Sequence, residues 1–149
     1  MSPAHTVSIR VRYAETDQMG VVYYANYFVW FEIGRVELMR SLGFEYRELE
    51  EQDQCFLPVV EANCRYRAPA RYDDVLTLET RVLNQRTSMI RFGYRLLREI
   101  AGKEPVLLAE GETVHVVVDR AMQKIQLPER FAAALRGMTG VRQQEAVSS

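Results

Sequence analysis

Several residue types on which metal sites and nucleophilic enzymes depend are scarce in this chain of 149 residues. It has two cysteines and two histidines. Cys55 and Cys64 match neither a disulfide framework nor a C-x-x-C motif, so we interpret both as small buried side chains in a reducing cytoplasm. His5 lies near the terminus, and His115 lies in a strand-like run where a satisfied or an exposed imidazole is expected rather than a catalytic one. No group of potential ligands has metal-binding spacing, so we expect no metal site.

Charge of one sign and long apolar runs are also missing. The 19 Lys and Arg residues against 20 Asp and Glu residues give a formal net charge of −1, which argues against a dedicated nucleic-acid-binding protein. The longest uncharged stretch, residues 18–31, has 14 residues and is too short to span a membrane. The N-terminus lacks the basic and apolar regions of a secretory signal. We therefore expect a cytoplasmic protein.

The motifs G-x-G-x-x-G, G-x-x-x-x-G-K-[ST] and G-x-S-x-G are absent as well. Any catalysis must therefore use carboxylates, hydroxyls and backbone amides. What the chain does have is apolar content, because 48% of its residues are hydrophobic and 10% are aromatic. This content and the length predict one folded domain over residues 1–138, followed by a polar, flexible tail over residues 139–149.

The hydrophobic patterns predict one strand, one long helix and then four further strands. Turn residues interrupt the pattern between the first strand and the helix, and short connections between the later strands favour an antiparallel meander. Because helices do not alternate with strands, the pattern indicates an α+β domain with an antiparallel sheet curled around the helix. The predicted strands are residues 7–13, 56–66, 75–83, 89–97 and 106–118, and the predicted helices are residues 27–42, a short one over 45–52, and another over 128–137.

The long helix is apolar over most of its circumference, so we expect it to be covered on most sides. Arg35 falls within its apolar arc and Glu32 lies at the edge, three residues away. Two interpretations remain open for this pair. It is either an ion pair within the helix or a polar feature of a pocket or a subunit interface.

Asp17 is the strongest candidate for chemistry, in the loop between the first strand and the helix. One interpretation is an Asx turn that shapes the loop. The other follows from the apolar run 21–31, which predicts a buried helix start with free N–H groups. Such amides can stabilise an oxyanion, and a carboxylate opposite them can act as a general base or as a nucleophile in acyl transfer.

The run Y-A-E-T-D-Q-M-G-V-V-Y-Y-A-N-Y-F-V-W-F-E, residues 13–32, resembles the signature of the 4-hydroxybenzoyl-coenzyme A thioesterase family of hot-dog folds. It is most similar to a branch of bacterial acyl-coenzyme A thioesterases associated with the Tol-Pal envelope system. The segment A-P-A-R-Y-D-D, residues 68–74, resembles the turn before that family's third strand. The likeness covers about residues 8–128, and it implies a helix wrapped by an antiparallel sheet.

The resemblance also implies catalytic roles for residues of the loop. Asp17 matches the family's catalytic carboxylate, as nucleophile or general base. Tyr24 matches the residue whose backbone N–H polarises the thioester carbonyl, although many close relatives have histidine there. Gly20 and Val21 match the close approach of the loop to the thioester.

Further residues are matched to substrate contacts. Glu32 matches a position that faces the acyl group in some relatives, and Pro58 and Val59 would line the acyl pocket. Arg86 and Ser88 match a stretch that contacts coenzyme A phosphates, with Thr87 in place of a charge found in some relatives. The tyrosines around the loop, which include Tyr13, Tyr23 and Tyr27, are expected to pack and form walls, or to aim a hydroxyl at the substrate.

The sequence therefore predicts a cytoplasmic thioesterase that hydrolyses short aliphatic or aromatic acyl-coenzyme A. Coenzyme A is then part of the substrate, and no cofactor is expected. The resemblance implies a homodimer or tetramer with active sites between subunits. Two alternatives are an acyl carrier protein thioesterase, for which Arg65, Arg67 and Arg71 could contact the acidic carrier, and a hot-dog protein that binds acyl groups without catalysis.

Overall fold

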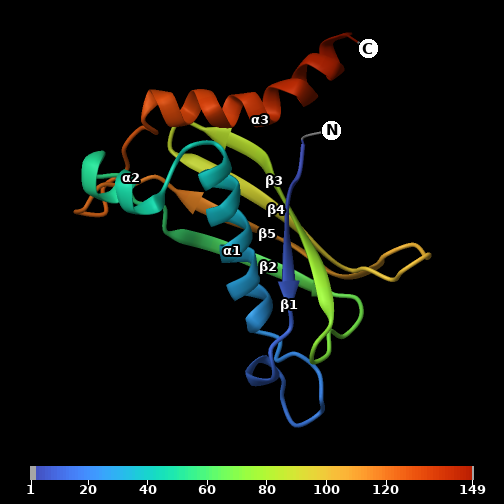
Figure 1. Ribbon diagram of the computed structural model, residues 1–149. Coiled ribbons are helices and arrows are strands. Elements are labelled where there is room, and N and C mark those ends of the chain that lie inside the picture. Colours follow the sequence, from blue (N-terminus) through green and yellow to red (C-terminus); the bar gives the residue numbers. More distant parts are fainter. Residues whose placement is uncertain (1–2, 149) are drawn as a thin grey trace.

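The computed structural model describes residues 3–148. Five strands form one antiparallel sheet in the order β1-β3-β4-β5-β2, and helix α1 lies across one face of it (Figure 1). In chain order, the elements are β1 (His5–Arg10), the 3-10 turn η1 (Tyr13–Glu15), α1 (Asn26–Ser41), α2 (Tyr46–Gln52), β2 (Val59–Tyr66), β3 (Val75–Arg86), β4 (Met89–Arg98), β5 (Val106–Val116) and α3 (Glu129–Ser148).

Alternating apolar residues place one face of the sheet in the core. Leu76, Leu78 and Val82 of β3 are fully buried, and so is every second residue of β4 from Ile90 to Leu96, to within 2% of full burial. These faces were predicted from the alternation alone. The first strand is shorter than predicted, because the chain turns into η1 after Arg10, and this turn leaves Tyr13 76% exposed.

The four later strands do not form one continuous meander. Strands β3, β4 and β5 follow one another as predicted, but β2 pairs with β5 at the far edge of the sheet. The edge position and the register shift between Val59 and Glu61 agree with the prediction from Pro58. Gly111 of β5 is a point of close backbone approach, because a Cβ atom there would lie 2.2 Å from the carbonyl oxygen of Asn63.

Helix α1 buries one side against β1, β3 and β4. Its other side is less covered than predicted, since Val29 is 50% and Ile33 41% exposed in a single chain. Nor is it the longest helix, because α3 has 20 residues against its 16. Arg35 is buried, and its guanidinium lies 3.8 Å from the Glu32 carboxylate, so the predicted ion pair within the helix is present.

A chain of hydrogen bonds continues from Arg35 into the core. Arg35 Nη1 donates to the Tyr94 hydroxyl at 3.5 Å, and that hydroxyl lies 2.6 Å from Thr113 Oγ1. His115 then lies between Thr113 Oγ1, 2.9 Å from Nε2, and the Leu57 carbonyl, 3.0 Å from Nδ1. The imidazole is therefore satisfied inside the core, as the sequence predicted, and is not available for catalysis.

Helix α3 lies at one end of the sheet, and the loop of residues 11–25 lies at the opposite end (Figure 1). The helix runs on through Ser148 and so covers most of segment 139–149, for which a flexible tail was predicted. Ser149 lies outside the described residues, and the division into a domain and a tail stays a prediction.

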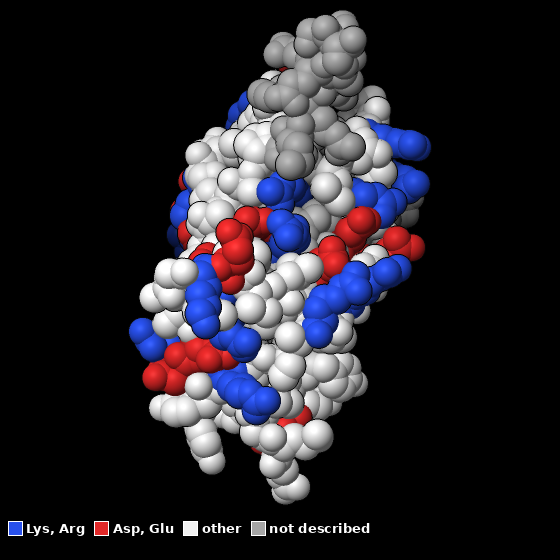
Figure 2. Space-filling view, turned by 90° about the vertical axis from the view of Figure 1, so that its right-hand side faces the viewer, with Lys and Arg blue, Asp and Glu red and all other residues white. Residues whose placement is uncertain are grey.

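Charged side chains of both signs are mixed over the face that Figure 2 presents. Several pair across neighbouring strands. Arg67 lies 2.8 Å from Glu110, and Arg91 lies 2.8 Å from Glu112. Across the part of the chain that the structure describes, no helix has the length and apolar character needed to cross a membrane.

Candidate active site

The loop that carries Asp17 is closed at its base by backbone pairing. Thr16 and Val22 form an antiparallel bridge, and the amide of Asp17 donates to the carbonyl of Val21 at 2.9 Å. The amide of Gly20 donates to the Asp17 carbonyl at 3.0 Å, and Gly20 has φ 79°, a left-handed conformation that glycine adopts at little cost. Asp17, Gly20 and Val21 therefore belong to one tight turn.

Asp17 is exposed at the start of this turn. Its Oδ1 accepts a hydrogen bond from the amide of Met19 at 2.9 Å, which is the Asx turn weighed as the simpler interpretation. Its Oδ2 has no hydrogen-bond partner among residues 3–148. The turn therefore orients the carboxylate and leaves one oxygen open to water or a ligand.

The start of α1 is more exposed than the apolar run 21–31 suggested. Tyr24 is 60% exposed, although Tyr27 one turn later is buried. The first helical amides are occupied, because Asn26 donates to Tyr23 and Tyr27 to Tyr24. Within the described residues, the amide of Tyr24 has no acceptor. The amide of Ala25 has no acceptor there either, so two adjacent free donors lie just before the helix, and the first is at the position predicted to polarise a carbonyl.

Aromatic rings surround this donor. The Tyr66 hydroxyl of β2 donates to the Tyr24 carbonyl at 3.1 Å, and the Tyr23 and Tyr24 rings lie 4.9 Å apart. Tyr27 is part of the core, where its hydroxyl accepts from the Ala70 amide at 3.3 Å. Tyr13 stands apart and packs edge-on against Tyr72. Within one chain, Tyr27 packs rather than lining an open surface.

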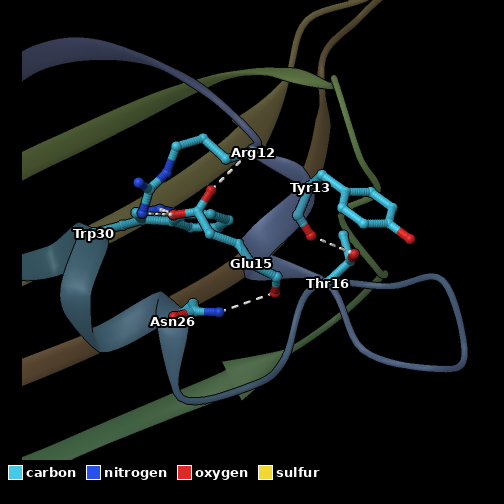
Figure 3. A network of polar contacts seen from close by, with 6 residues as sticks. All are labelled: Arg12, Tyr13, Glu15, Thr16, Asn26 and Trp30. Carbon is cyan, nitrogen blue, oxygen red and sulfur yellow. Dashed lines mark hydrogen bonds and ion pairs between the residues drawn. The ribbon is translucent and has the colours of Figure 1, made fainter.

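Sequence reasoning missed the residues that hold the loop together. The carboxylate of Glu15 accepts from the amide of Arg12 at 2.7 Å and from the indole N–H of Trp30 at 2.9 Å (Figure 3). The Glu15 carbonyl accepts from the Asn26 side chain at 2.9 Å (Figure 3). A glutamate at the third position of a short turn is a known acceptor for the amide before the turn, and this spacing was a usable signal.

The predicted coenzyme A contacts, Arg86 and Ser88, lie at the end of the sheet opposite the Asp17 loop. Strand β3 starts at Val75, beside Arg10, and ends at Arg86, 11 residues later, so about 36 Å of strand separates Arg86 from the base of the Asp17 loop. Arg86 lines a groove between the β3–β4 turn and α3, whereas the Ser88 hydroxyl is engaged with the Ile125 carbonyl at 2.8 Å. One chain therefore does not bring the predicted coenzyme A contacts to Asp17.

Pro58 and Val59 also lie away from the Asp17 loop, where β2 starts. Pro58 borders a cavity of about 360 Å³ between α2, the start of β2 and the turn after β5. Glu32 is exposed in the second turn of α1. The cavity is lined mainly by apolar residues: Tyr46, Leu49, Glu50, Cys55, Phe56, Leu57, Pro58, Asp119, Arg120 and Met122. Among residues 3–148, no three His, Cys, Asp or Glu side chains are grouped so as to hold a metal ion.

A family model described as the thioesterase-like superfamily matches residues 11–135, which include the whole loop and strands β2 to β5. The chain belongs to this superfamily. The acyl-CoA thioester hydrolase YbgC of Escherichia coli O6:H1 is 34% identical over 129 residues, covering 86% of this chain and 92% of YbgC. This similarity agrees with the branch that the loop sequence resembles.

Two solved structures of the superfamily have the same fold. The protein TT1821 of Thermus thermophilus superposes with a TM-score of 0.82 at 38% identity, covering 91% of this chain and 98% of that chain. A DHNA-CoA thioesterase of Staphylococcus aureus superposes with a TM-score of 0.83 at 27% identity, covering 98% of this chain and 95% of that chain. The predicted α+β hot-dog fold is thereby confirmed.

Proposed function

We propose that this protein hydrolyses the thioester bond of acyl-coenzyme A, with Asp17 and the backbone amide of Tyr24 as the reacting centre. One observation carries the proposal. A carboxylate oxygen and a backbone amide, both without partners among residues 3–148, stand on the two arms of one closed loop. The family membership and the activity named for YbgC support the same reaction.

The chemistry needs no other side chain of the loop. The amide of Tyr24 donates to the thioester oxygen, and that hydrogen bond strengthens as the oxygen becomes an oxyanion. As a general base, Asp17 takes a proton from water while the hydroxide attacks the carbonyl carbon. The C–S bond then breaks, and coenzyme A leaves as a thiolate that takes up the proton. As a nucleophile, Asp17 would instead form an anhydride that water hydrolyses to the same acid. No cofactor takes part.

The site becomes complete when a second copy of the chain covers it. Edge strand β2 is exposed along most of its length, and Val60 of β2 is 56% exposed. Two β2 strands that pair antiparallel about a two-fold axis would bring a second copy beside Tyr66, which contacts Tyr24. The acyl group would then lie between two subunits.

Substitution of Asp17 by asparagine tests the proposal. Loss of the base or nucleophile should lower kcat by about 10²- to 10⁴-fold with the fold unchanged. Asp119→Asn is the matched control, because Asp119 also accepts backbone amides in an exposed turn, those of Ala121 and Gln123. Thiol release from the same acyl group on coenzyme A and on acyl carrier protein identifies the carrier. Near wild-type turnover by Asp17→Asn would contradict the assignment.

A charge on the edge strand tests the subunit arrangement. Val60→Lys should reduce the mass in solution to that of one chain, 17.3 kDa, and should abolish turnover. Met122→Lys is the control, since Met122 is 66% exposed and lies outside the edge strand. A monomeric Val60→Lys protein with full activity would show that the site does not need a second copy.

The predicted nucleotide contact is separable from the chemistry. Arg86→Ala should raise KM for acyl-coenzyme A and leave hydrolysis of the matching N-acetylcysteamine thioester unchanged, because that substrate lacks the phosphates. Ser88 contributes less, since its hydroxyl already donates to Ile125. Equal effects of Arg86→Ala on both substrates would show that Arg86 supports the fold and does not bind the nucleotide. Short aliphatic and aromatic acyl groups, compared by kcat/KM, measure the predicted acyl preference.

A further inference from the structure

Glu15 is an acidic residue with almost no access to solvent, two positions before Asp17. Its side chain is 7% exposed, although the residues on both sides of it in the sequence are less buried. We propose that Glu15 is a positioning residue for hydrolysis, which fixes Asp17 relative to the amide of Tyr24. This inference rests on the proposed function, and it gives a role to a carboxylate that does not itself meet the substrate.

Both oxygens of the Glu15 carboxylate are occupied (Figure 3). Oε1 accepts from the backbone amide of Arg12 at 2.7 Å, and Oε2 accepts from the indole Nε1 of Trp30 at 2.9 Å. The Arg12 guanidinium reaches Oε2 only at 3.5 Å from a side chain that is 75% exposed. The directed bonds therefore come from neutral donors, and they tie the end of the first strand to the second turn of α1.

The main chain of Glu15 joins the two arms of the loop. Its carbonyl accepts from the amide of Tyr23 at 2.9 Å and from the side chain of Asn26 at 2.9 Å. Asp17 lies two residues beyond one end of the Glu15–Tyr23 hydrogen bond, and Tyr24 lies one residue beyond the other end. The separation of carboxylate and amide is consequently set by the placement of Glu15.

Energetics favour a positional role over a purely stabilising one. A buried carboxylate costs free energy that hydrogen bonds only offset, and an apolar side chain of similar volume often stabilises as well. An apolar side chain, however, cannot form directed hydrogen bonds. The two short hydrogen bonds fix both oxygens of the Glu15 carboxylate. A shift of about 1 Å at a reacting group can cost about 10²-fold in rate.

Glu15→Gln is the direct test, because the amide group keeps the shape and turns one acceptor into a donor that faces another donor. We expect kcat to fall about 10- to 100-fold, with KM within about threefold of wild type. In an Asp17→Asn background the same substitution should change kcat less than about twofold, since a positioning residue has nothing left to position. The control is Phe131→Leu, which changes a buried core residue of α3 and leaves the loop untouched.

The second variant is Trp30→Phe, which keeps an aromatic ring and removes the indole N–H. It should lower kcat in the same direction with KM unchanged, and it carries the test alone if Glu15→Gln does not fold. Two outcomes would overturn the inference. In the first, Glu15→Gln and Trp30→Phe lower kcat no more than Phe131→Leu does at an equal fall in Tm. In the second, the kcat loss of Glu15→Gln multiplies with that of Asp17→Asn in the double variant. If Asp17→Asn itself retained full kcat, the proposed function would fail instead, and the two failures are distinguishable.

Discussion

Protonation of His115 should destabilise the fold, because the ring is fully buried and its hydrogen bonds require one tautomer. The Leu57 carbonyl only accepts, so Nδ1 carries the proton, and Nε2 accepts from Thr113 Oγ1. A second proton on the ring would bring a charge into the core and would force the Thr113 hydroxyl to turn from donor to acceptor towards Nε2. Burial lowers the pKa of His115 from 6.5 to about 4; the Leu57 hydrogen bond opposes this shift, and the charge of Arg35 adds to it.

The sign and size of the effect follow from proton linkage. The pKa of His115 is lower in the folded state, so the unfolded chain takes up the proton first as the pH falls. The stability that neutral His115 provides is fully present above pH 6.5 and is lost progressively between pH 6.5 and about 4. Each pH unit in this window costs about 1.4 kcal/mol, so the loss is about 2 kcal/mol at about pH 5 and about 3 kcal/mol at about pH 4.

Urea unfolding of wild type and His115→Asn, at one protein concentration and several pH values between neutral and about 4.5, isolates this contribution. Asparagine offers an N–H near the Leu57 carbonyl and does not titrate. The free energy of unfolding of the wild type should fall more steeply with acid than that of the variant, by about 2 kcal/mol at about pH 5. If the difference in unfolding free energy between the two proteins stayed constant with pH, both the tautomer argument and the burial argument would be refuted.

Other substitutions test packing and polar satisfaction in the core. Gly111→Ala should prevent stable pairing of β2 with β5, since the new Cβ would meet the Asn63 carbonyl at 2.2 Å; soluble yield and thermal unfolding measure this, and a wild-type Tm would contradict it. Tyr46→Phe should leave stability unchanged or higher, because the Tyr46 hydroxyl is buried and makes no hydrogen bond of good geometry; burial raises the pKa of Tyr46 to about 12, and the nearby Arg35 guanidinium opposes this shift. Tyr94→Phe should instead cost about 1–3 kcal/mol of unfolding free energy, because it leaves Thr113 without that partner.

Local patterns were sufficient to predict most secondary structure and the buried faces. The alternation at Leu76, Leu78 and Val82 identified the core side of β3, because the period of a strand is the same wherever the strand lies. The position of β2 was not predictable in this way. Nothing in its residues distinguishes pairing with β5 from pairing with the next strand, since that choice depends on contacts some 50 residues away, such as Cys64 with Gly111.

The exposed side of α1 illustrates a second limit. Val29 and Ile33 are apolar, and a helix that is apolar all round predicts burial on all sides. In one chain these two residues are open, and in the proposed dimer a second copy of the chain would cover them. Sequence shows that such residues need cover, but it does not show whether the cover comes from the same chain.

Only part of the candidate site was predicted, because the other part depends on contacts between residues distant in sequence. Asp17 and Tyr24 were identified as candidates from the loop sequence, since both occupy positions that a short motif specifies. Glu15 was overlooked because its value depends on Trp30, 15 residues later, and the two meet only after α1 has packed on the sheet. A pair that distant in sequence has no periodic signal.

Glu15 and Asp17 lie two residues apart in one loop, and their surroundings separate their roles. Both oxygens of Glu15 accept from donors that the fold fixes, and burial keeps water away from the lone pairs that remain. Asp17 has one oxygen bound to the Met19 amide and the other open among the described residues. A base or nucleophile must combine a fixed orientation with a free lone pair, and of these two carboxylates Asp17 alone has both. The buried carboxylate is thus suited to hold the loop, and the exposed one is suited to the proposed reaction.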